Sequence, residues 1–394
     1  MRRLATGFSI FALIVVLFWW SIGPDWRRLL LAMPTDADVL FWSQSERDAA
    51  FRMMDRVSIL IKARNIPTSK TIREFGEGPP LSLGMDVDAY MQKQRHAAIV
   101  IVHNGKIRLE KYELGFGEHG RWTSFSVAKS LTSTLVGIAL HDGHIENLQD
   151  PVSKYIKDLK NSAYDDVTIE QLLTMSSGIA WDETYTDPNS DVARFNNHVS
   201  EDGGSNLVSY MSQLPRAHPA GEVWNYSTGE TNLIGVLVRE ATGKDLADYL
   251  SEKIWAPYGM QQDASWLLNE DGTEISGCCI QAATRDFARF GQFILDDGMI
   301  DGERVVPDYW IERATTKRIG FNDPGYGYGF QWWTYDHGAF AARGIFGQGI
   351  YIDPQRNLII ATNSSWSTAL GNDGQENPKR EAFYQAVVAA IDAE

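Results

Sequence analysis

One serine and one lysine have the spacing that nucleophilic catalysis requires. In Ser126-Val127-Ala128-Lys129 the hydroxyl and the amine lie three positions apart, and no other serine in the chain precedes a lysine by three. On a helix this spacing places both groups on one face, one turn apart. The lysine can accept the serine proton if burial or a neighbour lowers its pKa toward neutrality. The alternative is a helix-capping serine and a surface lysine.

Tyr226 is a second candidate acid/base. It lies between turn-forming residues, in Trp224-Asn225-Tyr226-Ser227-Thr228-Gly229, and an apolar stretch follows. A tyrosine can transfer protons if a nearby ammonium stabilises its phenolate. The alternative is a half-buried tyrosine whose hydroxyl faces water. The sequence contains neither Gly-x-Ser-x-Gly nor His-Glu-x-x-His, and its eight histidines form no ligand cluster. We therefore expect chemistry without a metal or an organic cofactor.

The elements that must position these residues follow from hydrophobic patterning. The serine motif opens a predicted helix over about 126–142, which has an apolar face and ends at Gly143. Predicted strands at 97–102 and 107–112 flank Asn104-Gly105, a strong hairpin signal. A second predicted strand pair occupies 349–354 and 358–362, and a helix is expected over 381–393. Strands near both ends with helices between them predict an α/β (α+β) fold: one antiparallel sheet flanked by helices, beside a helical lobe.

Composition excludes some partners. The chain has 36 basic and 51 acidic residues, a net charge of −15, and no run of basic side chains. An acidic surface repels phosphate backbones, so we expect no nucleic-acid partner. The two cysteines, Cys278 and Cys279, are adjacent, so a bridge between them would be strained and we expect two buried free thiols.

The N-terminus resembles a membrane segment. The uncharged stretch from Leu4 to Pro24 just reaches the length that spans a bilayer, and bulky residues occupy the place of a signal-cleavage site. We expect residues 1–24 to form an uncleaved anchor, with a single-pass location and the catalytic domain on the periplasmic side. The alternative is secretion after signal cleavage. Residues 25–90 are expected to be an extension that packs on a catalytic domain formed by 91–394.

Taken together, several ordered segments resemble the serine β-lactamase/penicillin-binding superfamily, in its class C-like branch. That branch includes family VIII carboxylesterases and 6-aminohexanoate-dimer hydrolases, and the resemblance covers roughly residues 95–390. The segments that carry it are Ser126–Lys129, Gln171–Ile179, Pro219–Gly221 with Tyr226–Thr228, Ala283–Gly291 and Gln331–Trp333. The likeness to the dimer hydrolases rests on Ser162–Asp165, Tyr185–Pro188 and Phe346–Gln348. The resemblance implies a β-lactamase/transpeptidase-like fold.

The resemblance also implies roles for individual residues. Ser126 is the expected nucleophile, and Lys129 and Tyr226 are the expected acid/base pair. The backbone N–H groups of Ser126 and Gly349 are the expected oxyanion donors. Tyr185 matches a tyrosine that lies over the active site in the dimer hydrolases; the alternative is a loop tyrosine packed on Trp181. The expected third motif, also assigned to substrate binding, is Phe346-Gly347-Gln348.

Two departures from the family pattern narrow the expected function. Thr228 stands where β-lactamases usually carry asparagine, and Phe346-Gly347-Gln348 replaces Lys-Thr-Gly. Loss of that lysine removes a charge-assisted contact to a substrate carboxylate, worth about 1.5–3 kcal/mol. We therefore expect hydrolysis of a small ester or an uncharged linear amide. The alternative is a penicillin-binding sensor acylated by β-lactams, or a weak β-lactamase or D-amino-peptidase. The sequence does not indicate an oligomeric state.

Overall fold

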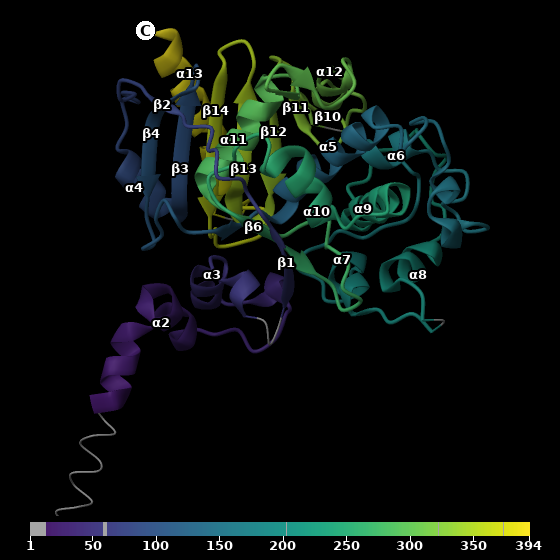
Figure 1. The fold of residues 1–394 in the computed structure, drawn as a ribbon, viewed down its shortest axis with the longest axis horizontal. Coiled ribbons are helices and arrows are strands. Elements are labelled where there is room, and N and C mark those ends of the chain that lie inside the picture. The colour runs from purple at the N-terminus through teal and green to yellow at the C-terminus, as the bar shows by residue number, and fades with distance from the viewer. Residues whose placement is uncertain (1–12, 58–60, 202, 322, 373) are drawn as a thin grey trace, which may run out of the picture.

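A computed structural model describes residues 13–57, 61–201, 203–321, 323–372 and 374–394. An eight-stranded sheet has helices on both faces and a helical lobe beside it (Figure 1). Neighbouring strands run antiparallel except β2 and β4, which are parallel. In spatial order the strands are β10 (Tyr326–Tyr328), β11 (Trp333–Tyr335), β12 (Phe340–Gly344), β13 (Gln348–Asp353), β14 (Leu358–Ser364), β3 (His96–His103), β4 (Lys106–Tyr112) and β2 (Gly76–Glu77). The expected fold class is confirmed.

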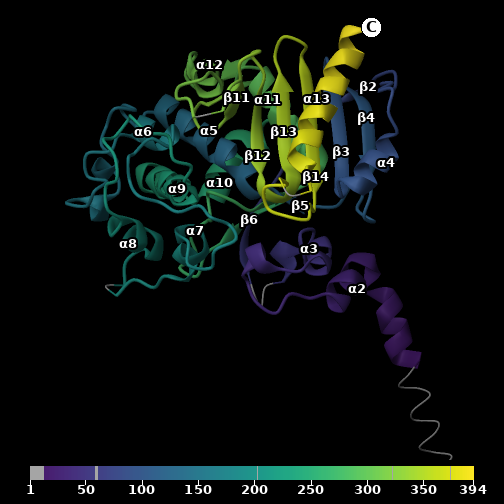
Figure 2. The ribbon, with the colours of Figure 1, turned by 180° about the vertical axis from the view of Figure 1, so that it is seen from behind.

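The helices divide between the sheet faces and the lobe. α11 packs on β14, β3 and β13, and α13 crosses the opposite face (Figure 2). α6, α8, α9 and α10 belong to the lobe (Figure 1). The helices are α2 (Gly23–Leu31), α3 (Gln44–Ala50), α4 (Val87–Lys93), α5 (Ala128–His141), α6 (Ile169–Leu173), α7 (Asp191–Arg194), α8 (Asn206–Ser212), α9 (Thr228–Thr242), α10 (Leu246–Leu250), α11 (Thr284–Leu295), α12 (Trp310–Thr315) and α13 (Glu376–Asp392).

The centre of the sheet joins the two ends of the chain. β14 pairs with β3 over its whole length, with Ile360 opposite Ile101. Because side chains alternate along a strand, Ile99 and Ile101 face α13, whereas Val100 and Val102 belong to the core on the other face. β3 is therefore apolar throughout, as expected of a strand buried on both faces. Asn104 and Gly105 both have positive φ, which fits the predicted hairpin turn.

A smaller sheet leads the chain into the helical lobe. Its strand order is β1 (Lys62–Ile66), β6 (Ala264–Leu268), β7 (Ile280–Ala282) and β5 (Trp122–Thr123). β1 comes from the N-terminal extension and pairs with β6 over five residue pairs. β5 ends just before Ser126, and β7 ends just before α11. This sheet therefore fixes where the serine motif begins relative to the body of the protein.

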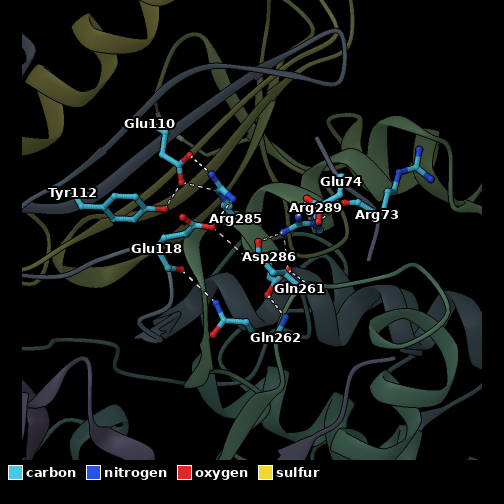
Figure 3. Close-up of polar contacts among 10 residues, drawn as sticks. All are labelled: Arg73, Glu74, Glu110, Tyr112, Glu118, Gln261, Gln262, Arg285, Asp286 and Arg289. Atoms are coloured by element: carbon cyan, nitrogen blue, oxygen red, sulfur yellow. Dashed lines mark hydrogen bonds and ion pairs between the residues drawn. The ribbon is translucent and has the colours of Figure 1, made fainter. Parts of the chain in front are cut away.

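A buried polar network fixes the start of α11. Asp286 is fully buried, accepts the backbone N–H groups of Gln261 and Gln262, and pairs with Arg289 at 3.1 Å (Figure 3). Arg285, on the neighbouring position, forms ion pairs with Glu110 in β4 and with Glu118. Buried charges of this kind persist only when they are paired and hydrogen-bonded. The network thus ties α11 to the sheet and to the 261–262 loop.

The structure corrects the prediction that residues 1–24 form a membrane anchor. Its residues 1–12 lie outside the described part of the chain. Over the residues described, the structure contains no helix that is both long enough and apolar enough to cross a bilayer. α2 instead carries Asp25 and Arg28 and packs on the body through the buried Leu29. The expected single-pass location and membrane partner are therefore not supported.

Candidate active site

Ser126 lies at the junction of β5 and α5. A short 3-10 turn, Phe125–Val127, precedes the helix, and Ser126 lines a cavity of about 870 Å³. Phe125 has a φ of 42°, a left-handed conformation that a bulky residue adopts only where its surroundings require it. Its ring is held by Phe51 and Phe346, with centroids 5.0 and 5.4 Å away. Aromatic packing therefore fixes the backbone on which the serine stands.

Lys129 lies one turn further along and is almost completely buried, with 1% of its surface exposed. Its Nζ donates hydrogen bonds to Thr228 Oγ1 at 2.9 Å and to the Gly277 carbonyl at 2.8 Å. Burial lowers the pKa of Lys129 to about 8, and the charge of Glu183 opposes this change. About one amine in ten is therefore neutral at pH 7, far more than for an ordinary lysine, and a general base requires this neutral form.

Tyr226 completes the group from the start of α9. Its side chain lines the same cavity as Ser126, the Ser126 hydroxyl is close enough to lower the pKa of the phenol, and the Lys129 Nζ lies 5.2 Å from the centre of the ring. Burial, together with the charge of Glu183, raises the pKa of Tyr226, so the phenol is neutral at physiological pH. Trp333 stacks on the ring at 5.7 Å. The structure thus brings a hydroxyl, an amine and a phenol together from separate parts of the chain.

Glu183 is a site residue that the sequence did not reveal. Its carboxylate accepts hydrogen bonds from the Thr228 N–H at 2.9 Å and from the Thr228 hydroxyl. It also accepts from the Trp181 indole and from the Tyr185 phenol, the latter at 2.9 Å. A lone acidic residue in a polar loop has no distinctive spacing, so only its position beside the noted Tyr185 segment could have drawn attention to it.

Tyr185 lines the same cavity, as the resemblance implied. Its phenol points to Glu183, and burial raises its pKa well above the ordinary value. The phenol is therefore a neutral group that can donate only one proton, and Glu183 receives it in this structure. Tyr185 helps to hold the carboxylate in place.

The expected third motif does not reach the cavity. None of Phe346, Gly347, Gln348 and Gly349 is among the described residues that line it. Phe346 packs against Phe51 and Phe125. The Gln348 amide donates to the carbonyls of Phe346, Ile345 and Ser364.

Gly349 lies within β13. There it is paired with Arg343 of β12, with Thr362 on its other side. It is therefore a sheet residue between two strands, away from the cavity wall.

The cavity is lined instead by Arg343, Gly344 and Ile345, at the end of β12. A Cβ on Gly344 would lie 2.6 Å from the Ser124 carbonyl, so this strand end approaches the serine motif closely. Arg343 lies among the rings of Tyr326, Trp333 and Tyr335 and pairs with Glu381 at 2.7 Å. The lysine of the family's third motif is absent, and Arg343 is a cation on this part of the cavity wall.

The two cysteines differ from expectation as well. Cys278 and Cys279 are joined as a disulfide, directly after the Gly277 carbonyl that binds Lys129. Among the residues that the structure describes, no group of three or more His, Cys, Asp and Glu side chains is placed to hold a metal ion.

Comparison with known proteins agrees with this geometry. The model of the family described as Beta-lactamase matches residues 83–384. The chain belongs to the beta-lactamase family. The 6-aminohexanoate-dimer hydrolase of Paenarthrobacter ureafaciens is 29% identical over 297 residues, which cover 71% of this chain and 75% of that protein. The family resemblance seen in the sequence is confirmed.

Solved structures of this family share the fold. A Bacillus anthracis protein assigned as a 6-aminohexanoate-dimer hydrolase superposes with a TM-score of 0.75 at 23% identity, covering 86% of this chain and 94% of that one. A family VIII carboxylesterase superposes with a TM-score of 0.59 at 16% identity, covering 74% and 93%. At these identities the likeness concerns the fold alone.

Proposed function

We propose that this protein is a serine hydrolase that cleaves a small ester or linear amide through an acyl-enzyme on Ser126. The observation that supports the proposal is that Ser126 and Tyr226 line one cavity while the buried Lys129 amine lies directly behind them, 5.2 Å from the centre of the Tyr226 ring. A nucleophile beside a base whose pKa is lowered is the arrangement that covalent catalysis needs. The cavity of about 870 Å³ is within the usual range for small-molecule sites.

The two acid/base groups take different roles in this proposal. Lys129, with a pKa of about 8, is the base: its neutral amine accepts the Ser126 proton while the serine oxygen forms a bond to the substrate carbonyl carbon. Tyr226, whose pKa is raised, is the acid: its phenol gives a proton to the leaving group as the carbonyl–leaving-group bond breaks. The lysine ammonium then returns a proton to the phenolate. Water hydrolyses the acyl-enzyme by the reverse sequence.

The oxyanion is assigned to backbone N–H groups of Ser126 and Ile345. Both residues line the cavity, whereas the originally expected Gly349 does not. Ile345 directly follows the strand end at Gly344 that approaches the serine motif. Donors of this kind typically contribute on the order of 10²–10³ in rate.

The substrate class rests on the relatives and on the cavity. One relative is a 6-aminohexanoate-dimer hydrolase, and a structural neighbour is a carboxylesterase, so we extend amide and ester hydrolysis to this chain. The cavity wall carries two cations, Arg343 and Arg380, and two carboxylates, Asp182 and Asp323. A carboxylate on the substrate could therefore bind the arginines, and an ammonium could bind the aspartates.

The experiment is covalent labelling combined with turnover. The purified protein is treated with a fluorophosphonate probe and assayed with short- and long-chain nitrophenyl esters, a linear amide dimer and a chromogenic cephalosporin. We expect labelling and continuing ester or amide turnover in the wild type and neither in Ser126→Ala. Labelling that persists in Ser126→Ala would refute the nucleophile. A burst that stops after one equivalent would show an acylated sensor in place of a hydrolase.

A further inference from the structure

Lys129 can act as a base only if its lone pair is not engaged by the protein. Its Nζ has two hydrogen-bond partners among the described residues, the Gly277 carbonyl and Thr228 Oγ1. A carbonyl can only accept. A threonine hydroxyl can either accept from the amine or donate its proton into the amine lone pair. The direction of the Thr228 hydroxyl therefore decides whether the neutral amine is free to receive the serine proton.

Glu183 determines that direction. Its carboxylate accepts from four donors: the N–H and hydroxyl of Thr228, the Trp181 indole and the Tyr185 phenol. A carboxylate can only accept hydrogen bonds, and two of these partners, the Thr228 N–H and the Trp181 indole, can only donate. The Thr228 hydroxyl must therefore donate to Glu183, so its oxygen can only accept from Lys129. Both hydrogens of a neutral amine are then directed to acceptors, and the lone pair remains available to Ser126.

We propose that Glu183 is a positioning residue for the acylation step, which acts through the Thr228 hydroxyl to hold the Lys129 amine with its lone pair free. This inference rests on the proposed function of Ser126 and Lys129. It also gives a physical role to Thr228, which stands where related enzymes usually carry asparagine. An asparagine amide can present either an oxygen or an N–H₂ group, whereas a threonine needs an outside acceptor to fix its single proton.

The charge of Glu183 has a second, measurable effect. Of the charged groups around the amine, Glu183 is the one that moves the pKa of Lys129, and it also raises the pKa of Tyr226. The other titratable groups that line the cavity are Asp182, Tyr185, Tyr226, Asp323, Arg343 and Arg380, and Tyr328 in β10 packs against Tyr226. Removing the Glu183 charge should therefore move the acid limb of a pH–rate profile, which Lys129 sets, toward lower pH.

The test compares pH profiles of acylation, measured as the rate of fluorophosphonate labelling and as kcat/KM on a nitrophenyl ester. In Glu183→Gln we expect the acid limb to move down by about one pH unit, because a nearby opposite charge is lost. The plateau should fall about five- to tenfold, as the Thr228 proton becomes free to occupy the amine lone pair. In Thr228→Val we expect a reduced plateau with an unmoved acid limb, and in Thr228→Ser a recovery toward wild type.

The controls separate the possible failures. Asp187→Asn removes a carboxylate from the same loop without touching Thr228, and its profile should match that of the wild type. If the wild type is neither labelled nor active, the proposed function itself fails. If the wild type is active and Glu183→Gln loses rate without any movement of the acid limb, the residue has only a structural role and this inference is overturned.

Discussion

The buried side chain of Glu230 allows a quantitative test of how burial near the site changes the pKa of a carboxyl group. It lies in the first turn of α9, close to Tyr226, and only 2% of its surface is exposed. One carboxyl oxygen accepts from the Ser177 hydroxyl and from the Tyr164 phenol at 3.3 Å, while the other has no hydrogen-bond partner within the described structure. Burial raises the pKa of Glu230 from 4.5 to about 8, and the two hydroxyl donors oppose this rise only in part. At pH 7 the folded protein therefore holds this side chain as a neutral acid.

The raised pKa makes stability depend on pH with a defined sign. Between pH 4.5 and 8 the unfolded chain has released this proton and the folded chain still holds it. The contribution of Glu230 to stability is therefore greatest below pH 4.5 and is lost as the pH rises to 8. The difference, 8 − 4.5 = 3.5 units, corresponds to roughly 5 kcal/mol at about 1.36 kcal/mol per unit.

Glu230→Gln replaces the acid with a neutral group of the same shape. We expect the free energy of unfolding of the variant, relative to wild type, to rise by about 1.4 kcal/mol per pH unit from pH 5 to 8 and then level off. The measurement is urea denaturation followed by tryptophan fluorescence at pH 5, 6, 7, 8 and 9. Glu222→Gln, at an exposed position, is the matched control and should show a flat difference. A flat difference for Glu230→Gln as well would refute the assignment of a neutral buried acid.

Two further predictions concern the base and the α11 network. Lys129→Arg keeps the positive charge but removes the base, because a guanidinium stays protonated. Fluorophosphonate labelling of this variant should slow by about 10²–10⁴-fold at every pH. A recovery of the labelling rate at high pH would contradict this expectation. Asp286→Ala leaves the buried Arg289 without its buried partner and should lower the free energy of unfolding by about 3–5 kcal/mol in chemical denaturation. The double variant with Arg289→Met should recover most of that loss; if it is no more stable than Asp286→Ala, the unpaired charge is not the cause.

The sequence predicted the elements whose patterns are local. The Asn104-Gly105 hairpin, the central strands and the helix that begins at Ser126 each follow from turn chemistry or apolar periodicity within a short window. The family motifs that contain Ser126, Lys129 and Tyr226 are also short, and their order along the chain is distinctive. Such features need no knowledge of how distant segments pack.

The wall of the cavity at β12 could not be located from the sequence in the same way. Glycine recurs at 344, 347 and 349, and a glycine at any of these positions permits the chain to turn. The apolar pattern does not indicate which of them ends the strand, so the sequence does not show that Arg343–Ile345 line the cavity and that Phe346–Gln348 follow them outside it. Glu183 was missed for a related reason: its partners come from its own loop and from α9, a pairing that only the folded chain defines.

The relative placement of Ser126 and Tyr226 depends on a buried polar hub at Gln331, whose contacts no local pattern indicated. Gln331 accepts at its backbone carbonyl from Ser130 in α5, at 2.7 Å, and at its side-chain carbonyl from Thr231 in α9, also at 2.7 Å. Its amide nitrogen donates to the Leu173 carbonyl at the end of α6. Ser126 lies just before α5 and Tyr226 just before α9, so one residue joins the two helices that follow them. Because unpaired buried polar groups are costly, these helices cannot slide past each other without breaking the hub. Apolar contacts alone would tolerate small displacements, whereas directed hydrogen bonds fix the position of α5 relative to α9.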